Sequence, residues 1–104
     1  MKNFIVSNDV DCDGTSLQGY IEIDFKTLVE VLGKPPSAGD EYKIDAEWPI
    51  KFDDGTVATI YNWKDGINYN GTRGIPIEDI HNWHIGGKSR VAVDKVKELF
   101  VVKD

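Results

Sequence analysis

The segment Gly86–Arg90 reads GGKSR and has the composition of an anion-binding turn. Two glycines let a backbone approach an anion closely, free N–H groups at a helix start point outward, and basic side chains add charge. A complete phosphate-binding loop needs another glycine where this chain has Asn82, so only the weaker pattern is present. An ordinary glycine bend before a capped helix is the alternative. The predicted anion ligands are Gly86, Gly87, Lys88, Ser89 and Arg90.

Three aspartates near the N-terminus match the opening of a calcium-binding loop. Asp9, Asp11 and Asp13 alternate along the chain before Gly14, as carboxylates that converge on one hard cation do. The match then fails, because the position that needs a bidentate glutamate is Tyr20. The sequence therefore predicts no resident cofactor. Calcium at the three aspartates is the one possibility left open, and a polar loop that binds its own backbone N–H groups is the alternative.

The segment Glu47–Trp63 predicts a hairpin with two possible registers. If Asp54-Gly55 is a two-residue turn, Trp48 pairs with Tyr61. If the loop has three residues and Gly55 takes a positive φ, Trp48 pairs with Ile60. The three-residue loop is preferred because Asp54 suits its second position and Ile60 then joins the apolar face. Pro49 lacks a backbone donor, so its strand is expected at a sheet edge or at a bulge.

The preferred register places Tyr61 and Trp63 away from the first core layer, among the charged residues Lys43, Asp45 and Glu47. Aromatic rings among charges form a surface suited to holding a ligand or a partner. The alternative is that a helix of the same chain covers these rings, as helices commonly do on one face of an α+β sheet. The position of the rings therefore decides whether the hairpin carries a site.

Composition limits the classes of function. The 104 residues predict one domain, residues 1–104, with little room for a deep cleft. A net charge of −6 argues against phosphate neutralisation of nucleic acid and against anionic membranes. The single cysteine, Cys12, cannot form an internal disulfide, and no apolar run is long enough to span a membrane. We expect a cytoplasmic protein that binds neither membrane nor nucleic acid directly.

The residues above must be positioned by a small set of elements. Asp24 is a suitable N-cap, and apolar residues at helical spacing follow it as far as Leu32, before Gly33. The order of elements predicts an α+β fold: a mostly antiparallel sheet of about five strands with two helices. Outside the hairpin, the expected elements are strands at 2–7, 18–24 and 80–85, a helix at 25–32, and a helix that Ser89 caps and that ends near Val101.

Several segments resemble a family of small uncharacterised proteins from bacteriophages and large DNA viruses. The similarity covers residues 14–87 and lies in Gly14–Ile21, Leu32–Pro35, Asp45–Trp48, Asp54–Lys64 and Trp83–Gly87. The resemblance implies a virus-encoded accessory protein, a class that often blunts host immunity. Some such proteins cage nucleotide immune signals without cutting them, and others bind host effector proteins. The resemblance assigns no residue a role.

Three functions follow as hypotheses. The leading one is a non-catalytic viral protein that evades host defence by sequestering a small anionic, possibly nucleotide-derived, signal in a homo-oligomer within the host cytoplasm. The second is an inhibitor of anti-CRISPR or anti-restriction type that binds a host defence protein. The third is a small enzyme acting on a nucleotide or peptide, with His84, Glu47 and Cys12 as candidates. Besides the anion segment, the ligand residues expected under the leading hypothesis are Lys43, Glu47, Tyr61, Trp63, Lys64, Trp83 and His84.

Overall fold

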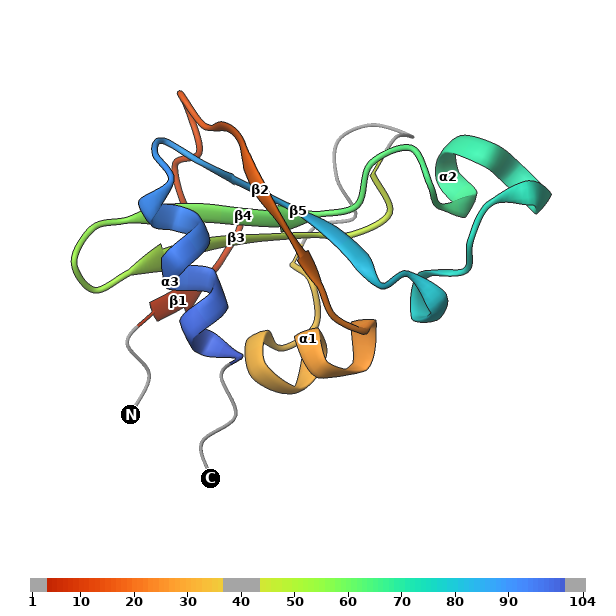
Figure 1. Cartoon of the computed structure of the whole chain (residues 1–104), viewed down its shortest axis with the longest axis horizontal. Coiled ribbons are helices and arrows are strands. Elements are labelled where there is room, and N and C mark those ends of the chain that lie inside the picture. The colour runs from red at the N-terminus through yellow and green to blue at the C-terminus, as the bar shows by residue number, and fades with distance from the viewer. Residues whose placement is uncertain (1–3, 37–43, 101–104) are drawn as a thin grey trace.

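The computed structural model describes residues 4–36 and 44–100 and shows an α+β fold (Figure 1). Its five strands form one antiparallel sheet in the order β1-β3-β4-β5-β2. This arrangement confirms the predicted fold class. The strands are β1 Phe4–Val6, β2 Ser16–Glu22, β3 Glu47–Phe52, β4 Val57–Tyr61 and β5 Asn82–Gly87. The helices are α1 Phe25–Leu32, α2 Ile67–Asn70 and α3 Val91–Leu99, and short 3-10 turns lie at Gly71–Arg73 and Ile77–Asp79.

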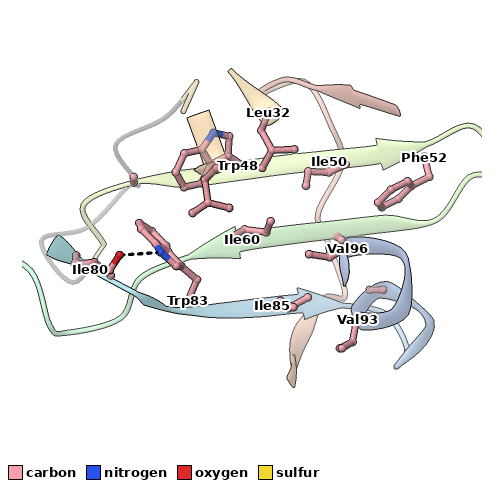
Figure 2. Close-up of a cluster of buried hydrophobic side chains, with 14 residues drawn as sticks. Leu32, Trp48, Ile50, Phe52, Ile60, Ile80, Trp83, Ile85, Val93 and Val96 are labelled. Carbon is pink, nitrogen blue, oxygen red and sulfur yellow. Dashed lines mark hydrogen bonds between the residues drawn. The ribbon is translucent and has the colours of Figure 1, made fainter. Parts of the chain in front are cut away.

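Helices α1 and α3 pack on the same face of the sheet and bury its core (Figures 1 and 2). Two glycines of the sheet allow α3 to pack closely against the strands that carry them. A Cβ at Gly19 would lie 2.9 Å from a methyl of Val93, and one at Gly87 would lie 2.4 Å from the Cβ of Ala92. Helix α1 is capped as predicted: the Asp24 carboxylate accepts a hydrogen bond from the Thr27 N–H at 3.0 Å. The opposite face of the sheet, here called the open face, carries neither α1 nor α3. Only part of it is exposed, because Pro49 and Thr59 on this face are buried.

The hairpin has the three-residue loop and the register that the sequence favoured. Trp48 pairs with Ile60, and the Phe52 N–H donates to the Thr56 carbonyl. Gly55 has a φ of 92°, and the Asp54 side chain accepts from the Thr56 N–H at 2.9 Å. This register places the core residues of β3 and β4 beneath the helices and Tyr61 on the open face.

The expectation that Pro49 lies on an edge strand or at a bulge is wrong. Strand β3 lies between β1 and β4, and its pairing with β4 runs through Pro49 without a shift in register. The missing donor is tolerated for a local reason. Strand β1 ends at Val6, opposite Ile50. Beyond this pair, the Pro49 carbonyl accepts a hydrogen bond from the Ser7 N–H at 3.2 Å. The proline nitrogen therefore faces the point where the neighbouring strand stops.

The other boundaries differ modestly from expectation. Strand β5 begins at Asn82 rather than Ile80 and includes both glycines. Helix α3 begins at Val91, where the Ser89 hydroxyl accepts from the Val91 N–H at 3.3 Å. Its buried residues are Ala92, Val93 and Val96. The predicted strand start at 2–3 and the helix end near Val101 lie outside the described residues. No helix among the described residues is long and apolar enough to cross a membrane.

One ion pair ties α3 to the hairpin turn, and its removal should have a small effect. The Lys95 ammonium lies 2.8 Å from the Asp54 carboxylate and 5.8 Å from the centre of the Phe52 ring. The pair holds the pKa of Asp54 well below its ordinary value, chiefly through its hydrogen bond to Lys95. We expect Lys95→Gln to lower the midpoint of urea unfolding slightly at low salt and by less at high salt, because exposed pairs are screened. A loss that did not shrink with salt would assign the effect to the contact between Lys95 and Phe52 instead.

Candidate functional site

A row of side chains crosses the open face of the sheet on four neighbouring strands. Glu47 on β3 pairs with Tyr61 on β4, Tyr61 pairs with His84 on β5, and His84 pairs with Tyr20 on β2. Since alternate residues of a strand point to opposite faces, these residues point away from the buried Trp48, Ile60 and Trp83. One register therefore gathers residues that are distant in sequence.

The rings of this row contact one another. The His84 ring lies between two tyrosines, with ring centres 5.0 Å from Tyr20 and 5.4 Å from Tyr61. Trp63 extends the group, with its ring 6.4 Å from that of Tyr61 and nearly perpendicular to it. Edge-to-face arrangements of this kind are the preferred packing of aromatic side chains. The cluster leaves large apolar surface in solvent, because Tyr20 is 59% exposed and Trp63 is 40% exposed.

A shallow hollow lies within this cluster. Its volume is about 250 Å³, and it is lined by Leu17, Tyr61, Trp63 and His84. We call it the aromatic hollow. Leu17 reaches it because β2 carries a bulge between Leu17 and Gly19, which changes the register of the strand against β5. The hollow is open to solvent and smaller than the pockets of about 300–1,000 Å³ that enclose small ligands.

A buried asparagine holds the chain that presents Trp63. Asn62 is 0% exposed. Its side-chain oxygen accepts hydrogen bonds from the Asp45 N–H at 2.7 Å and the Ala46 N–H at 3.1 Å. Its amide nitrogen donates to the carboxylates of Asp45 at 2.9 Å and Asp65 at 3.0 Å. Three of these hydrogen bonds tie the end of β4 to the segment before β3, and the fourth ties it to Asp65, so Trp63 leaves the sheet in a defined direction.

The segment after Trp63 forms a small excursion that extends away from the sheet (Figure 1). Lys64 has a φ of 61°, a left-handed conformation that is uncommon outside glycine. The Asn70 side chain donates to the Lys64 carbonyl at 2.9 Å and so holds this turn from α2. The Lys64 ammonium lies 5.7 Å from the ring centres of both Trp63 and Tyr69. These are cation–π distances, so the Trp63 ring already attracts an ammonium group of its own chain.

Negative charge reaches the rings of the hollow. Burial raises the pKa of the Tyr61 hydroxyl, and the charge of Glu47 raises it further. Burial lowers the pKa of His84, while the charge of Asp65 acts in the opposite direction. The His84 imidazole is therefore neutral at pH 7, with both acidic residues acting on the ring cluster.

The lowered pKa of His84 predicts a pH dependence of stability. Protonation of His84 is less favourable in the folded state than in the unfolded state. The stability that this difference contributes is complete above the ordinary pKa of 6.5 and is lost as the pH falls through the lower folded pKa. We expect the melting temperature to fall as the pH is lowered from 7 to 5, and His84→Gln to flatten that part of the curve. A variant with an unchanged slope would assign the acid sensitivity to another group.

One of the predicted ligand residues, Trp83, belongs to the core. The expectation that Trp83 stacks on a ligand is wrong, because its side chain is 0% exposed. Its ring stacks on Phe25 at 6.4 Å and meets Trp48 at 5.4 Å, beneath α1. The expectation for Lys43 concerns a residue outside the described residues. Glu47, Tyr61, Trp63, Lys64 and His84 do lie at or beside the aromatic hollow.

The two glycines of the predicted anion turn at 86–90 do not form an open backbone cradle, whereas an anion site at Lys88, Ser89 and Arg90 stays a prediction. Gly86 and Gly87 are buried in β5, where a Cβ on Gly86 would lie 2.6 Å from the Thr59 hydroxyl. Their small size therefore serves close packing rather than approach to an anion. Three N–H groups at the start of α3 are already bonded within the segment: the Val91 N–H to the Ser89 hydroxyl, the Ala92 N–H to the Ser89 carbonyl and the Val93 N–H to the Arg90 carbonyl. Lys88, Ser89 and Arg90 are exposed and do not line the aromatic hollow.

At Asp11 the acidic loop follows the alternative in which a side chain binds a backbone N–H group of its own loop. The Asp11 carboxylate accepts a hydrogen bond from the Asp13 N–H at 2.9 Å, and the Asp9 N–H donates to the Ser7 hydroxyl at 3.1 Å. Among residues 4–36 and 44–100 no three His, Cys, Asp or Glu side chains are gathered as metal ligands. Calcium at Asp9, Asp11 and Asp13 stays a prediction.

The single thiol lies on the segment that links the two edge strands. Residues 7–15 connect β1 to β2 at opposite edges of the sheet, and Cys12 lies close enough to Glu47 to feel its charge. Burial raises the pKa of the Cys12 thiol, and the carboxylates of Glu47, Asp11 and Asp13 raise it further. An activated cysteine nucleophile needs the opposite shift, so this geometry gives the enzyme hypothesis no support.

Four residues of the site were missing from the sequence analysis: Leu17, Tyr20, Asn62 and Tyr69. Tyr20 could have been found, because it alternates with the apolar Ile21 and Ile23 and must face the other way. The position of Leu17 depends on a β-bulge that no local sequence pattern predicts.

Comparison of the chain with family models, with curated proteins and with solved structures gives no match. The open face and the aromatic hollow are therefore the features that indicate a function.

Proposed function

We propose that this chain is a non-catalytic binding protein that engages a partner protein through the aromatic hollow and the exposed rings around it. The observation that carries the proposal is the exposure of Tyr20, on β2, and of Trp63, two residues beyond β4, at the two ends of one cluster of contacting rings. Exposed tryptophan and tyrosine are the residues that most often dominate the energy of protein interfaces. Strand β2 positions Tyr20, and the hydrogen bonds of Asn62 hold the chain at Trp63, so both rings are presented without the entropy cost of a loose loop.

The shape of the site supports a protein partner over an enclosed small molecule. A ligand pocket normally buries 70–90% of its ligand, and a shallow hollow of about 250 Å³ on an open sheet face does not. The cationic residues predicted to hold an anion at 88–90 lie elsewhere, which leaves Lys64 as the cation described beside the hollow. The resemblance to virus-encoded proteins points to a host defence protein as the partner, and the expected homo-oligomer stays a prediction.

Truncation of Trp63 tests the proposal. We expect Trp63→Ala to reduce the yield of a stoichiometric partner that co-purifies with the tagged wild-type chain, and to weaken its binding by about tenfold or more when the two purified proteins are titrated. Circular dichroism should show that the variant remains folded.

The matched control is Val91→Ala. Val91 is also apolar and 49% exposed, but it lies on α3, in the layer on the other side of the sheet. Its truncation should leave binding unchanged. If both variants bound the partner as the wild type does, or if both lost it equally, the open face would not be the interface.

A further inference from the structure

The chemical class of group that enters the aromatic hollow can be inferred from its walls. Tyr61, Trp63 and His84 supply aromatic rings, and Leu17 supplies an aliphatic wall. The faces of such rings carry negative electrostatic potential and attract cations placed within about 6 Å of the ring centre. A wall of this composition offers little to an anion and a favourable contact to a guanidinium or an ammonium group.

The acidic residues near the hollow also favour a cation over an anion. Glu47 acts on Tyr61, and Asp65 acts on His84. Both are acidic, and the whole chain carries a net charge of −6. A field of this sign steers positively charged partners toward the face and disfavours phosphate.

Lys64 shows that a ring of the hollow accepts a cation. Its ammonium lies 5.7 Å from the centre of the Trp63 ring and at the same distance from that of Tyr69. The long side chain belongs to an exposed turn, so it can move away at low cost when another cation arrives. Lys64 is then a competitor of the incoming group, and not a ligand for it.

From these observations we infer that the aromatic hollow receives an arginine or lysine side chain of the partner protein. The inference rests on the proposed function and names the chemistry of its central contact. The volume of about 250 Å³ suits one side chain rather than a nucleotide. Arginine is the better fit of the two, because its planar guanidinium stacks on aromatic rings as well as carrying charge.

The test uses capped single amino acids as probes of the full-length protein. N-acetyl-arginine amide and N-acetyl-lysine amide are the cationic probes, N-acetyl-glutamine amide is the neutral control, and adenosine monophosphate is the anionic control. The readout is the chemical shift of the Trp63 indole N–H, assigned by its loss in Trp63→Phe. We expect saturable shifts with the two cations, weaker with added salt, and none with glutamine amide at the same concentrations.

Substitution of Lys64 distinguishes a cationic occupant of the hollow from an anionic one. Lys64→Gln should strengthen binding of the cations by about two- to fivefold, since a competing ammonium is removed. It should weaken binding of the nucleotide if an anion is the true occupant. Glu47→Gln should weaken binding of the cations, and Val91→Ala should change nothing.

Two results would overturn the inference. One is a saturable shift with adenosine monophosphate that weakens in Lys64→Gln, while arginine amide gives none. The other is the absence of any shift with either cation. The proposed function is judged separately, by the loss of the co-purifying partner in Trp63→Ala, so a protein partner that engages the hollow through an uncharged residue would refute the inference alone.

Discussion

Trp83→Ala is expected to lower the free energy of unfolding by about 3–5 kcal/mol, the range for large aromatic residues truncated in a core. Its ring is 0% exposed and packs between Phe25 and Trp48. The indole N–H also donates to the carbonyls of Ile23 at 3.1 Å and Ile80 at 3.3 Å, and Figure 2 shows the second of these bonds. Domains are typically stable by about 5–15 kcal/mol, so this single loss removes a large share.

Urea denaturation followed by circular dichroism measures the effect. Trp83→Phe keeps one ring, removes the donor and leaves a smaller cavity, so it should fall between the wild type and the alanine variant and stay measurable if Trp83→Ala does not fold. Trp63→Ala is the matched tryptophan control on the open face, where we expect a loss of about 1–2 kcal/mol because the ring is 40% exposed. Equal losses at the two tryptophans would contradict the assignment of one to the core and the other to the site.

This pair of tryptophans shows where sequence reasoning worked and where it failed. Trp83 and His84 are consecutive on a strand, so they cannot both point to the open face. The alternation was visible in the sequence, but which of the two faced outward depended on the pairing of His84 with Tyr61. That pairing joins strands that are separated by the whole α2 excursion, and no local sequence pattern predicts it.

Local interactions were the predictable part. Helix α1 is specified by its Asp24 cap, its apolar spacing and Gly33, all within ten residues. The hairpin register follows from Asp54 and Gly55, whose hydrogen bond and positive φ belong to the turn itself. In both cases the interactions that decide the structure lie within the segment that forms it.

The glycines of β5 show why their assignment to an anion turn was wrong. A pair of adjacent glycines indicates that something approaches the backbone closely, and that much was right. The approaching groups are the Ala92 methyl on one side of the sheet and the Thr59 hydroxyl on the other. Because both are parts of the same chain, brought there by packing, the sequence signal for close approach could not distinguish them from a ligand.

The hydrogen bonds of the buried Asn62 side chain make this position sensitive to added charge. We expect Asn62→Asp to lower the free energy of unfolding at pH 7 by about 3–5 kcal/mol, the cost of an uncompensated buried charge. The new carboxylate could still accept from the Asp45 and Ala46 N–H groups. It would replace the two donated hydrogen bonds with repulsion from the carboxylates of Asp45 and Asp65. Thermal unfolding monitored between pH 4 and pH 7 measures the loss.

The pH dependence distinguishes this mechanism from simple loss of packing. The folded state would raise the pKa of the new carboxyl above its unfolded value of about 3.9, so the penalty grows as the pH rises above that value and shrinks in acid. Asn62→Ala leaves two buried N–H groups without an acceptor at any pH, so its cost of about 2–4 kcal/mol should not vary in this way. If the difference between the two variants were constant from pH 4 to pH 7, the carboxylates would not be the cause. Both variants should also weaken partner binding, because the position of Trp63 depends on the chain that Asn62 holds.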